Sequence, residues 1–214
     1  MSTFRFAIMG AGNIAHQFCD AVTLVEDCEV SAIASKDLGR AQKFAEECSV
    51  AHAYDNYEQM LIEEKPDCVY IAVTPNDHFR LTMLCLEHRV PVLCEKAMFT
   101  NSAEAKAVFE KAEKDQTFVM EAMWSRFLPA VNQAKKWAAE GKIGRLEALQ
   151  GRIGFLAPEG ADNRYHSPLL CGGAATDITV YAYEIATWLV NEPVRKTSVS
   201  YTHLRAHETL ANLV

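Results

Sequence analysis

The sequence predicts an α/β protein that begins with a doubly wound parallel sheet and continues into the first part of an α+β domain. Strand and helix patterns alternate over roughly the first 120 residues, which is typical of parallel strands joined by right-handed crossovers. A glycine-rich turn follows the first strand. The alternation then stops near residue 122, so we expect one domain over 1–122 and a second over 123–198.

The first domain divides into five strand patterns and five helix patterns. Apolar, β-branched runs predict strands at 4–9, 29–35, 68–73, 90–95 and 117–123. Helical spacing of apolar residues predicts helices at 12–25, 37–48, 56–64, 78–88 and 102–115. The short segment 51–54 only connects the second helix to the third.

The second domain begins with a helix over 125–142, entered near Pro129 and ended by Gly141. Partial alternation over 146–156 predicts a long strand, suited to an antiparallel sheet. A turn-rich loop follows, and a helix is predicted over 175–190, before Pro193. This pattern is that of an α+β domain of which only the first part is present.

The last residues, 199–214, read VSYTHLRAHETLANLV. His203 and His207 stand four apart, which on a helix would make a possible metal pair. The segment, however, resembles the translation of a transposase-end sequencing adapter. We therefore expect the natural sequence to end near Thr197, the tail to be non-native, and no metal site to exist.

Composition excludes several classes of function. The net charge of −7 argues against a nucleic-acid or anionic membrane surface. No apolar run approaches the roughly 20 residues that span a bilayer, and no signal peptide is evident. The seven cysteines include no CxxC motif, so we expect a reduced, cytoplasmic protein without a catalytic cysteine.

The turn after the first strand carries the motif G-x-G-x-x-A, formed by Gly10, Gly12 and Ala15. The first glycine allows a tight turn, the second lets the backbone approach a pyrophosphate, and the small third residue lets the helix pack closely on the sheet. Asn13 and Ile14 lie at the helix start, where backbone amides face the anion. On the first of several strand–helix units, this motif predicts a Rossmann dinucleotide site.

The end of the second strand predicts which dinucleotide is bound. A carboxylate there would bond the ribose hydroxyls of NAD, but the sequence has Ser35 and Lys36, with Arg40 one helical turn on. A hydroxyl and two cations suit a 2′-phosphate. Asp37 is the competing acid, although it also suits a helix start. We expect NADP, with NAD as the alternative.

The strand over 90–95 ends in an adjacent carboxylate and ammonium, Glu95 and Lys96, instead of common turn residues. One interpretation is a strand end that meets solvent. The other is a catalytic lysine at the carboxyl edge of a parallel sheet, where such folds bind their ligands.

Five segments in order resemble one family. The motifs GAGNIA, VTPNDH, CEKAM, EAMWSRFLP and GGAATDITVY look like those of the glucose–fructose oxidoreductase/inositol dehydrogenase (Gfo/Idh/MocA) family. The resemblance covers residues 4 to about 195 and is nearest to the dihydrodiol dehydrogenase and xylose-type dehydrogenase branch.

The resemblance implies catalytic roles for Lys96, Tyr181 and Asp177. The lysine would reach substrate and nicotinamide ribose, the tyrosine would act as general acid/base, and the aspartate would orient substrate. Asp177 and Tyr181 stand four apart in a predicted helix, hence on one face. Tyr181 as plain helix packing remains the alternative. We expect Lys96 and Tyr181 to converge over the nicotinamide.

The resemblance also implies ligand contacts. Those with the cofactor would come from Thr74, Pro75, Asn76, His78, Glu95, Lys96, Trp124 and Arg126. Those with substrate would come from Lys96, Asn163, Arg164, His166, Asp177 and Tyr181. For His78 a role at the helix start is equally open.

Three positions depart from the family pattern. Ala97 replaces a proline after Lys96, so we expect no cis bond there. Thr179 and Cys171 replace glycines near the catalytic helix, and these changes could shift the lysine or crowd the pocket.

The expected function is an NADP-dependent oxidoreductase that moves hydride between nicotinamide and a CH–OH carbon of a sugar, cyclic polyol or trans-dihydrodiol. The alternatives are a non-catalytic dinucleotide sensor and an inactive, poorly soluble fragment. Partners would be the small-molecule substrate and, in the full-length protein, a second copy bound through the sheet that follows this chain's end.

Overall fold

The computed structural model describes residues 3–158, 160, 163–192 and 194–196. These residues divide into two compact units, with the boundary between Ala122 and Met123. The predicted tail, 199–214, lies outside the described residues.

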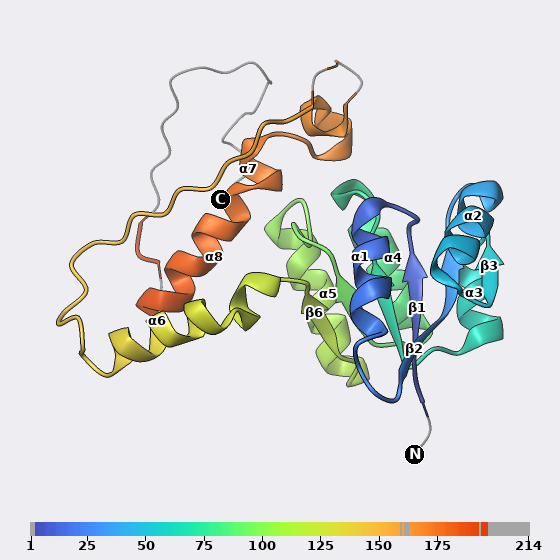
Figure 1. Cartoon of the computed structure of the whole chain (residues 1–214), viewed down its shortest axis with the longest axis horizontal. Helices are drawn as coiled ribbons and strands as arrows, with labels where there is room; N and C mark the ends of the chain where they lie inside the picture. The colour runs from blue at the N-terminus through green and yellow to red at the C-terminus, as the bar shows by residue number, and fades with distance from the viewer. Residues whose placement is uncertain (1–2, 159, 161–162, 193, 197–214) are drawn as a thin grey trace. The chain divides into compact units, whose positions relative to one another are not determined.

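The first unit contains a parallel sheet of six strands in the order β3-β2-β1-β4-β5-β6, flanked by helices (Figure 1). The strands are β1 (Phe4–Met9), β2 (Cys28–Ala34), β3 (His52–Tyr54), β4 (Cys68–Ile71), β5 (Val92–Cys94) and β6 (Val119–Glu121). The helices are α1 (Asn13–Val22), α2 (Leu38–Cys48), α3 (Tyr57–Glu64), α4 (His78–Glu87) and α5 (Ser102–Asp115), with the 3₁₀ turn η1 (Pro75–Asp77). The predicted doubly wound fold is confirmed.

Two apolar cores cover the two faces of the sheet. Ala7 and Met9 of β1 pack with residues of α3 and α4, including Leu81. Ile8, between them, packs on the other face with α1 and α2, including Phe44. Because successive side chains of a strand point to opposite faces, a continuous apolar run is what a strand buried on both sides requires.

The strand register brings the functional turns to one edge. Met9, the last residue of β1, pairs with Ala34 on one side and Ile71 on the other. Ile71 pairs in turn with Cys94, and Cys94 with Glu121. The turns after β1, β2, β4, β5 and β6 therefore all leave from the same edge of the sheet, where parallel folds bind ligands.

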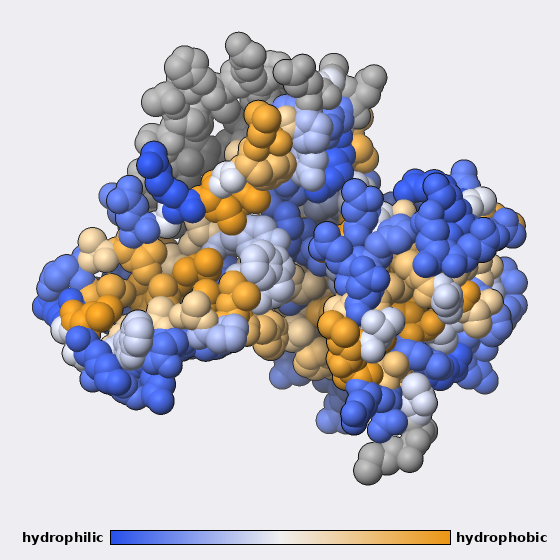
Figure 2. All heavy atoms as spheres, viewed as in Figure 1, coloured by the Kyte–Doolittle hydropathy of each residue, from blue (hydrophilic) through white to orange (hydrophobic). Residues whose placement is uncertain are grey.

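The second unit is mainly helical in its described residues. Its elements are η2 (Trp124–Phe127), α6 (Pro129–Ala139), η3 (Arg164–His166), η4 (Pro168–Leu170), α7 (Ala174–Asp177) and α8 (Thr179–Val190). All residues of α6 are described and none is buried. Figure 2 shows apolar surface gathered over the second unit, and the exposed apolar side chains include Phe127, Trp137 and Leu156.

The predicted strand over 146–156 was wrong. All of these residues are described, and none has strand structure. Phe155 is 51% and Leu156 96% exposed. A β-strand requires hydrogen bonds to a neighbouring strand. Alternation of apolar and polar residues does not by itself provide that neighbour. None of the strands in the described residues belongs to the second unit.

The predicted helix over 175–190 is interrupted at Ile178, whose φ of −125° separates α7 from α8. The run from Thr176 to Val180 is rich in β-branched residues, which lower helix propensity. The Thr179 hydroxyl also donates to the Ala174 carbonyl (3.0 Å), which already accepts from the amide of Ile178. Asp177 and Tyr181 therefore lie on different helices, not on one face of a single helix.

Two further features complete the fold. Residues 52–54, read as a connection, form β3, which pairs with Ala32–Ala34 of β2 at the edge of the sheet. A helix long and apolar enough to cross a bilayer does not occur among the described residues.

The turn after β1 requires glycine at position 10. Gly10 has φ +110°, a region that residues with a side chain rarely adopt. A Cβ on Gly10 would lie 2.7 Å from the carbonyl oxygen of Ala72 and 2.9 Å from the side chain of Val73. A Cβ on Gly12 would lie 3.9 Å from the same oxygen, an ordinary contact.

We expect Gly10→Ala to lower the free energy of unfolding by about 2–3 kcal/mol through backbone strain and overpacking. Gly12→Ala is the matched control and should stay within about 1 kcal/mol of the parent chain. Urea unfolding followed by circular dichroism measures both. Equal stability of the two variants would show that this turn does not depend on glycine.

Candidate active site

Helix α1 begins directly after the glycine turn. Gly12 is its N-cap residue, in an extended conformation with φ −104°. The helix begins without a side-chain cap and without an acidic residue in its first turn, which contains Asn13 and Ile14. Ala15 is fully buried against the sheet. Close backbone approach and an uncapped helix start are what a diphosphate needs, so this cradle fits the predicted dinucleotide.

The end of β2 lies beside the same turn. Ser35 is buried, and its hydroxyl accepts weakly from the amide of Asp37 (3.5 Å). Asp37 is the N-cap of α2, where its Oδ1 accepts from the amide of Arg40 (2.9 Å). The Arg40 guanidinium reaches back to the Ala11 carbonyl in the glycine turn (3.2 Å). Of the two readings of Asp37, the structure supports the helix cap.

Lys36 joins the end of β2 to the turn after β4. Its Nζ lies 2.5 Å from Oδ2 of Asp77, and its side chain is 67% exposed. Burial raises the pKa of Asp77, but the Lys36 ammonium and the Arg80 guanidinium outweigh it, so that the pKa of this carboxyl is lowered. Lys36 is thus an exposed cation at the sheet edge with a local carboxylate partner.

The turn after β4 contains the other residues predicted to contact the cofactor on this side. Thr74 is half-buried and Pro75 buried, while Asn76 is exposed in η1. His78 begins α4 and is fully buried. Of these four residues, Asn76 has the most accessible side chain for a ligand.

The side chain of His78 contacts three carbonyl groups. Its Nε2 lies 3.0 Å from the Val73 oxygen, and its Nδ1 lies 3.0 Å and 3.2 Å from the oxygens of Ala97 and Met98. Burial lowers the pKa of His78, and hydrogen bonding to these carbonyls opposes that shift. The ring has no exposed surface and links two turns in this structure, and its contact with a cofactor stays a prediction.

The turn after β5 presents Lys96. The Lys96–Ala97 peptide bond is cis, so the expectation of a trans bond without proline was wrong. Contacts on the C-terminal side hold the turn: the Ala97 carbonyl faces the His78 ring, and the Met98 amide donates to Glu121 Oε1 (2.9 Å). The trans bond was predicted because position 97 is not proline. That prediction could not take these two long-range contacts into account.

Glu95 supports the same turn from the other side. Its Oε1 accepts from the Tyr70 hydroxyl (2.6 Å), and its Oε2 accepts from the backbone amide of Lys96 (3.2 Å). Phe18 stacks on the Tyr70 ring at 4.0 Å between centroids. Burial raises the pKa of Glu95, and the nearby Glu121 adds to the rise, whereas Lys96 and the hydrogen bonds oppose it. The turn that carries Lys96 is therefore held by hydrogen bonds to two acidic side chains, Glu95 and Glu121.

In the second unit, the predicted general acid/base is tied to an aromatic neighbour. The Trp124 indole N–H donates to the Tyr181 hydroxyl oxygen (3.1 Å), and the two ring centroids are 5.8 Å apart. Tyr181 is 9% exposed, whereas Trp124 is 56% exposed. Sequence reasoning named both residues but not this contact.

Arg126, predicted to bind cofactor phosphate, is paired within the second unit. Its Nε donates to Oε1 of Glu184, a residue of α8 that is only 6% exposed. Oε2 of Glu184 accepts from the Ser125 hydroxyl (3.0 Å). Glu184 was missed because an acid in an amphipathic helix usually indicates a solvated face.

The predicted substrate-contacting residues form a second cluster. Arg164 Nη1 lies 3.4 Å from Oδ1 of Asp177, which is buried at the end of α7. The Arg164 guanidinium also lies over the Tyr165 ring at 4.0 Å. Asn163 caps η3 by accepting from the Tyr165 amide (3.0 Å), and His166 ends η3. Arg164 and Asp177 are thus brought together, whereas Asn163 has a local structural contact.

The site residues fall in both units. Lys96 belongs to the first and Tyr181 to the second, and their convergence stays a prediction. Glu121, Tyr70 and Glu184 are the supporting residues that sequence reasoning missed. For Glu121 a signal existed, because it ends a strand at the same sheet edge as Lys96.

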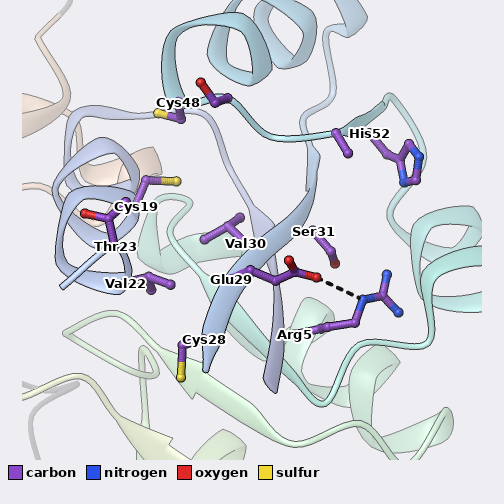
Figure 3. Close-up of a pocket in the computed structure, with 12 residues that line it drawn as sticks. Arg5, Cys19, Val22, Thr23, Cys28, Glu29, Val30, Ser31, Cys48 and His52 are labelled. Carbon is purple, nitrogen blue, oxygen red and sulfur yellow. Dashed lines mark ion pairs between the residues drawn. The ribbon is translucent and has the colours of Figure 1, made fainter. Parts of the chain in front are cut away.

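A pocket of about 400 Å³ lies elsewhere in the first unit (Figure 3). It is lined by the opening residues of β1 and β2, including Arg5 and Glu29, whose charged groups are 3.7 Å apart. These residues are at the opposite end of the strands from the glycine turn. Burial raises the pKa of the lining thiol Cys19 to about 12, so it is a poor nucleophile. This pocket is not the candidate active site.

A cluster of three or more His, Cys, Asp or Glu side chains arranged to hold a metal is not found in the described part of the chain.

Two family models match the chain. One, described as an oxidoreductase family with an NAD-binding Rossmann fold, matches residues 4–123. The other, a GFO/IDH/MocA C-terminal domain, matches residues 131–212. The second match extends into the segment 199–214, for which a non-native origin stays a prediction.

Similar proteins point the same way. A trans-1,2-dihydrobenzene-1,2-diol dehydrogenase of Mus musculus is 32% identical over 212 residues, covering 96% of this chain and 61% of the mouse protein. A probable dehydrogenase from Thermotoga maritima superposes with a TM-score of 0.76 at 22% identity, over 89% of this chain and 56% of that one.

A 3-ketoreductase from Actinomadura kijaniata, solved with TDP-benzene and NADP, has a TM-score of 0.62 at 26% identity and covers 67% of this chain and 45% of that one. The chain thus spans about three fifths of the length of the mouse relative. By its sequence motifs, its fold and these matches, the chain belongs to the Gfo/Idh/MocA family of NAD(P)-dependent oxidoreductases.

Proposed function

We propose that the chain forms the cofactor-binding and catalytic part of an NADP-dependent dehydrogenase that oxidises a CH–OH carbon of a sugar, cyclic polyol or trans-dihydrodiol. The observation that carries the proposal is the shared sheet edge, where the glycine cradle and the Lys96 turn leave β1 and β5, the two strands that pair with β4. Similarity to the dihydrodiol dehydrogenase of the mouse supports the substrate class.

The proposed chemistry divides between two groups of residues. The nicotinamide ring, when bound, supplies the acceptor for a hydride. Gly10 and Gly12 bring backbone amides to the diphosphate. The Lys96 ammonium stabilises the developing alkoxide of the substrate, and Tyr181 takes the hydroxyl proton as the hydride leaves carbon.

Supporting residues prepare these groups for their roles. Glu95 and Glu121 fix the backbone on either side of Lys96, which limits where its amino group reaches. In the second unit, Arg164 pairs with Asp177, and this arrangement suits orientation of substrate hydroxyl groups by a carboxylate. Positioning of this kind contributes to the rate without a chemical step of its own.

The preference for NADP rests on the cations after β2. Lys36 and Arg40 flank the ribose position predicted from the fold, and Arg40 already contacts the glycine turn. Asp37 caps α2 through its Oδ1, which gives this acid a structural role apart from any contact with ribose hydroxyls. A 2′-phosphate matches two cations and a hydroxyl donor.

Replacing the proposed acid/base groups tests the catalytic role. Lys96→Ala and Tyr181→Phe should each lower kcat by roughly 10²- to 10⁴-fold, because proton transfer and charge stabilisation are lost. Affinity for the dinucleotide should change by no more than a few fold. Steady-state rates on pentoses, hexoses, inositols and dihydrodiols, with dinucleotide binding by fluorescence, measure both quantities.

Matched controls come from residues outside the site. Tyr183→Phe, an exposed tyrosine on the same helix, and Lys106→Ala, an exposed lysine on α5, should leave kcat unchanged. Full activity of Lys96→Ala would refute the catalytic role. A parent protein that binds dinucleotide but oxidises none of these compounds would favour a sensor.

The cofactor preference is tested at the end of β2. Lys36→Ala and Arg40→Ala should each weaken NADP binding by about tenfold, the cost of one charged hydrogen bond, and change NAD binding less than twofold. Lys43→Ala, exposed on α2, is the control. Calorimetric titration at fixed salt measures the affinities, and tenfold tighter binding of NAD by the parent protein would reverse the assignment.

A further inference from the structure

Helix α8 contains a buried carboxylate that the proposed chemistry does not use. Glu184 is 6% exposed and stands three residues after Tyr181, so the two side chains leave neighbouring positions on the helix surface. Both carboxylate oxygens are engaged: one accepts from the Ser125 hydroxyl at 3.0 Å and the other from Nε of Arg126. Both donors belong to η2, the turn that also carries Trp124.

We propose that Glu184 is a positioning residue that fixes η2 against α8, so that the Trp124 indole N–H meets the Tyr181 hydroxyl oxygen. The inference rests on the proposed function of Tyr181 as general acid/base. Glu184 contacts neither proposed ligand; it acts through Ser125 and Arg126 on the orientation of Trp124.

A carboxylate in this position requires its partners. A buried charge is costly unless it is paired and hydrogen-bonded, and Glu184 has both a cation and a hydroxyl donor. Arg126 is 44% exposed, so water solvates the outer part of its guanidinium. If η2 were displaced, the buried Glu184 carboxylate would lose its hydrogen bonds to Ser125 and Arg126. The pair therefore favours the observed position of η2.

A cation–π contact with Trp188 also holds Arg126 in place. The Arg126 guanidinium lies 4.6 Å from the Trp188 ring centroid, and Lys135 Nζ of α6 lies 3.0 Å from the same centroid. Trp188 is four residues after Glu184, one turn further along α8. Arg126 is thus held by a carboxylate and by an aromatic face, which accounts for its position without any bound phosphate.

The hydrogen bond between Trp124 and Tyr181 is the contact through which Glu184 would affect catalysis. The indole N–H donates to the phenolic oxygen at 3.1 Å, which fixes one lone pair of that oxygen. A donor of this kind restricts the orientation of the hydroxyl group. We therefore expect kcat to depend on the position of η2 against α8.

The kinetic test uses graded substitutions at position 184 of this chain. Glu184→Ala should lower kcat about 100-fold, the cost typical of small misplacement of a reacting group. Glu184→Gln should restore part of the rate, because its amide oxygen still accepts from Ser125. Dinucleotide affinity should stay within twofold in both variants. Glu192→Gln, an exposed acid just after α8, is the matched control and should behave as the parent.

A spectroscopic readout makes the test independent of turnover. The indole N–H resonance of Trp124, identified in ¹⁵N spectra by its loss in Trp124→Phe, should shift in Glu184→Ala and less in Glu184→Gln. Retention of the other indole resonances shows that the variants are folded. The Arg126→Ala and Glu184→Ala effects should be non-additive, as for residues of one network.

The outcomes separate this inference from the proposed function. An unchanged Trp124 resonance in Glu184→Ala overturns it, whatever the activity. Weaker dinucleotide binding at unchanged kcat also overturns it, because Arg126 would then act on the cofactor. If the parent chain turns over no substrate, the proposed function fails, and the resonance alone decides whether Glu184 positions Trp124.

Discussion

Lys96 is held by hydrogen bonds that join three strand ends of the parallel sheet. The turn after β4 contributes the His78 ring, which faces the carbonyls of Ala97 and Met98. The end of β6 contributes Glu121, which accepts from the Met98 amide. The position of the amino group is therefore a property of the assembled sheet, and a peptide containing only the turn would not reproduce it.

The same turn has an unusual electrostatic setting. Glu95 and Glu121 end adjacent strands, and each is used to accept a backbone amide. Burial raises the pKa of Glu95, and Glu121 raises it further. Glu95 accepts from the Lys96 amide, and Glu121 reaches the same turn through the Met98 amide. The sheet edge thus supplies both the cation and the means of orienting it.

Much of the first unit could be predicted from the sequence, because its signals are local. Apolar runs indicate strands buried on both faces, and G-x-G-x-x-A indicates the turn at Gly10. The features that were missed depend on partners far along the chain. β3 is only three residues long and is defined by pairing with β2. The cis bond before Ala97 and the role of Glu121 both require contacts between separate turns.

The second unit was harder to predict for the same reason. A strand over 146–156 was expected from alternation, but alternation without a neighbouring strand does not make a ladder. The break at Ile178 depends on the Thr179 hydroxyl competing for a backbone carbonyl, a choice that periodicity cannot reveal. Glu184 looked like an ordinary surface acid, and its pairing with Ser125 and Arg126 becomes visible only when η2 and α8 are packed together.

The cap at Asp37 has a consequence for redesign of the cofactor pocket. Because Oδ1 of Asp37 accepts from the backbone amide of Arg40, replacing the side chains of Lys36 and Arg40 would change the charge beside the glycine turn without removing the helix cap. An acid introduced at Ser35, directly after β2, would place a carboxylate at the end of that strand, where a buried hydroxyl now stands. The charge at the strand end and the initiation of α2 are thereby separate design variables, at Ser35 and Asp37.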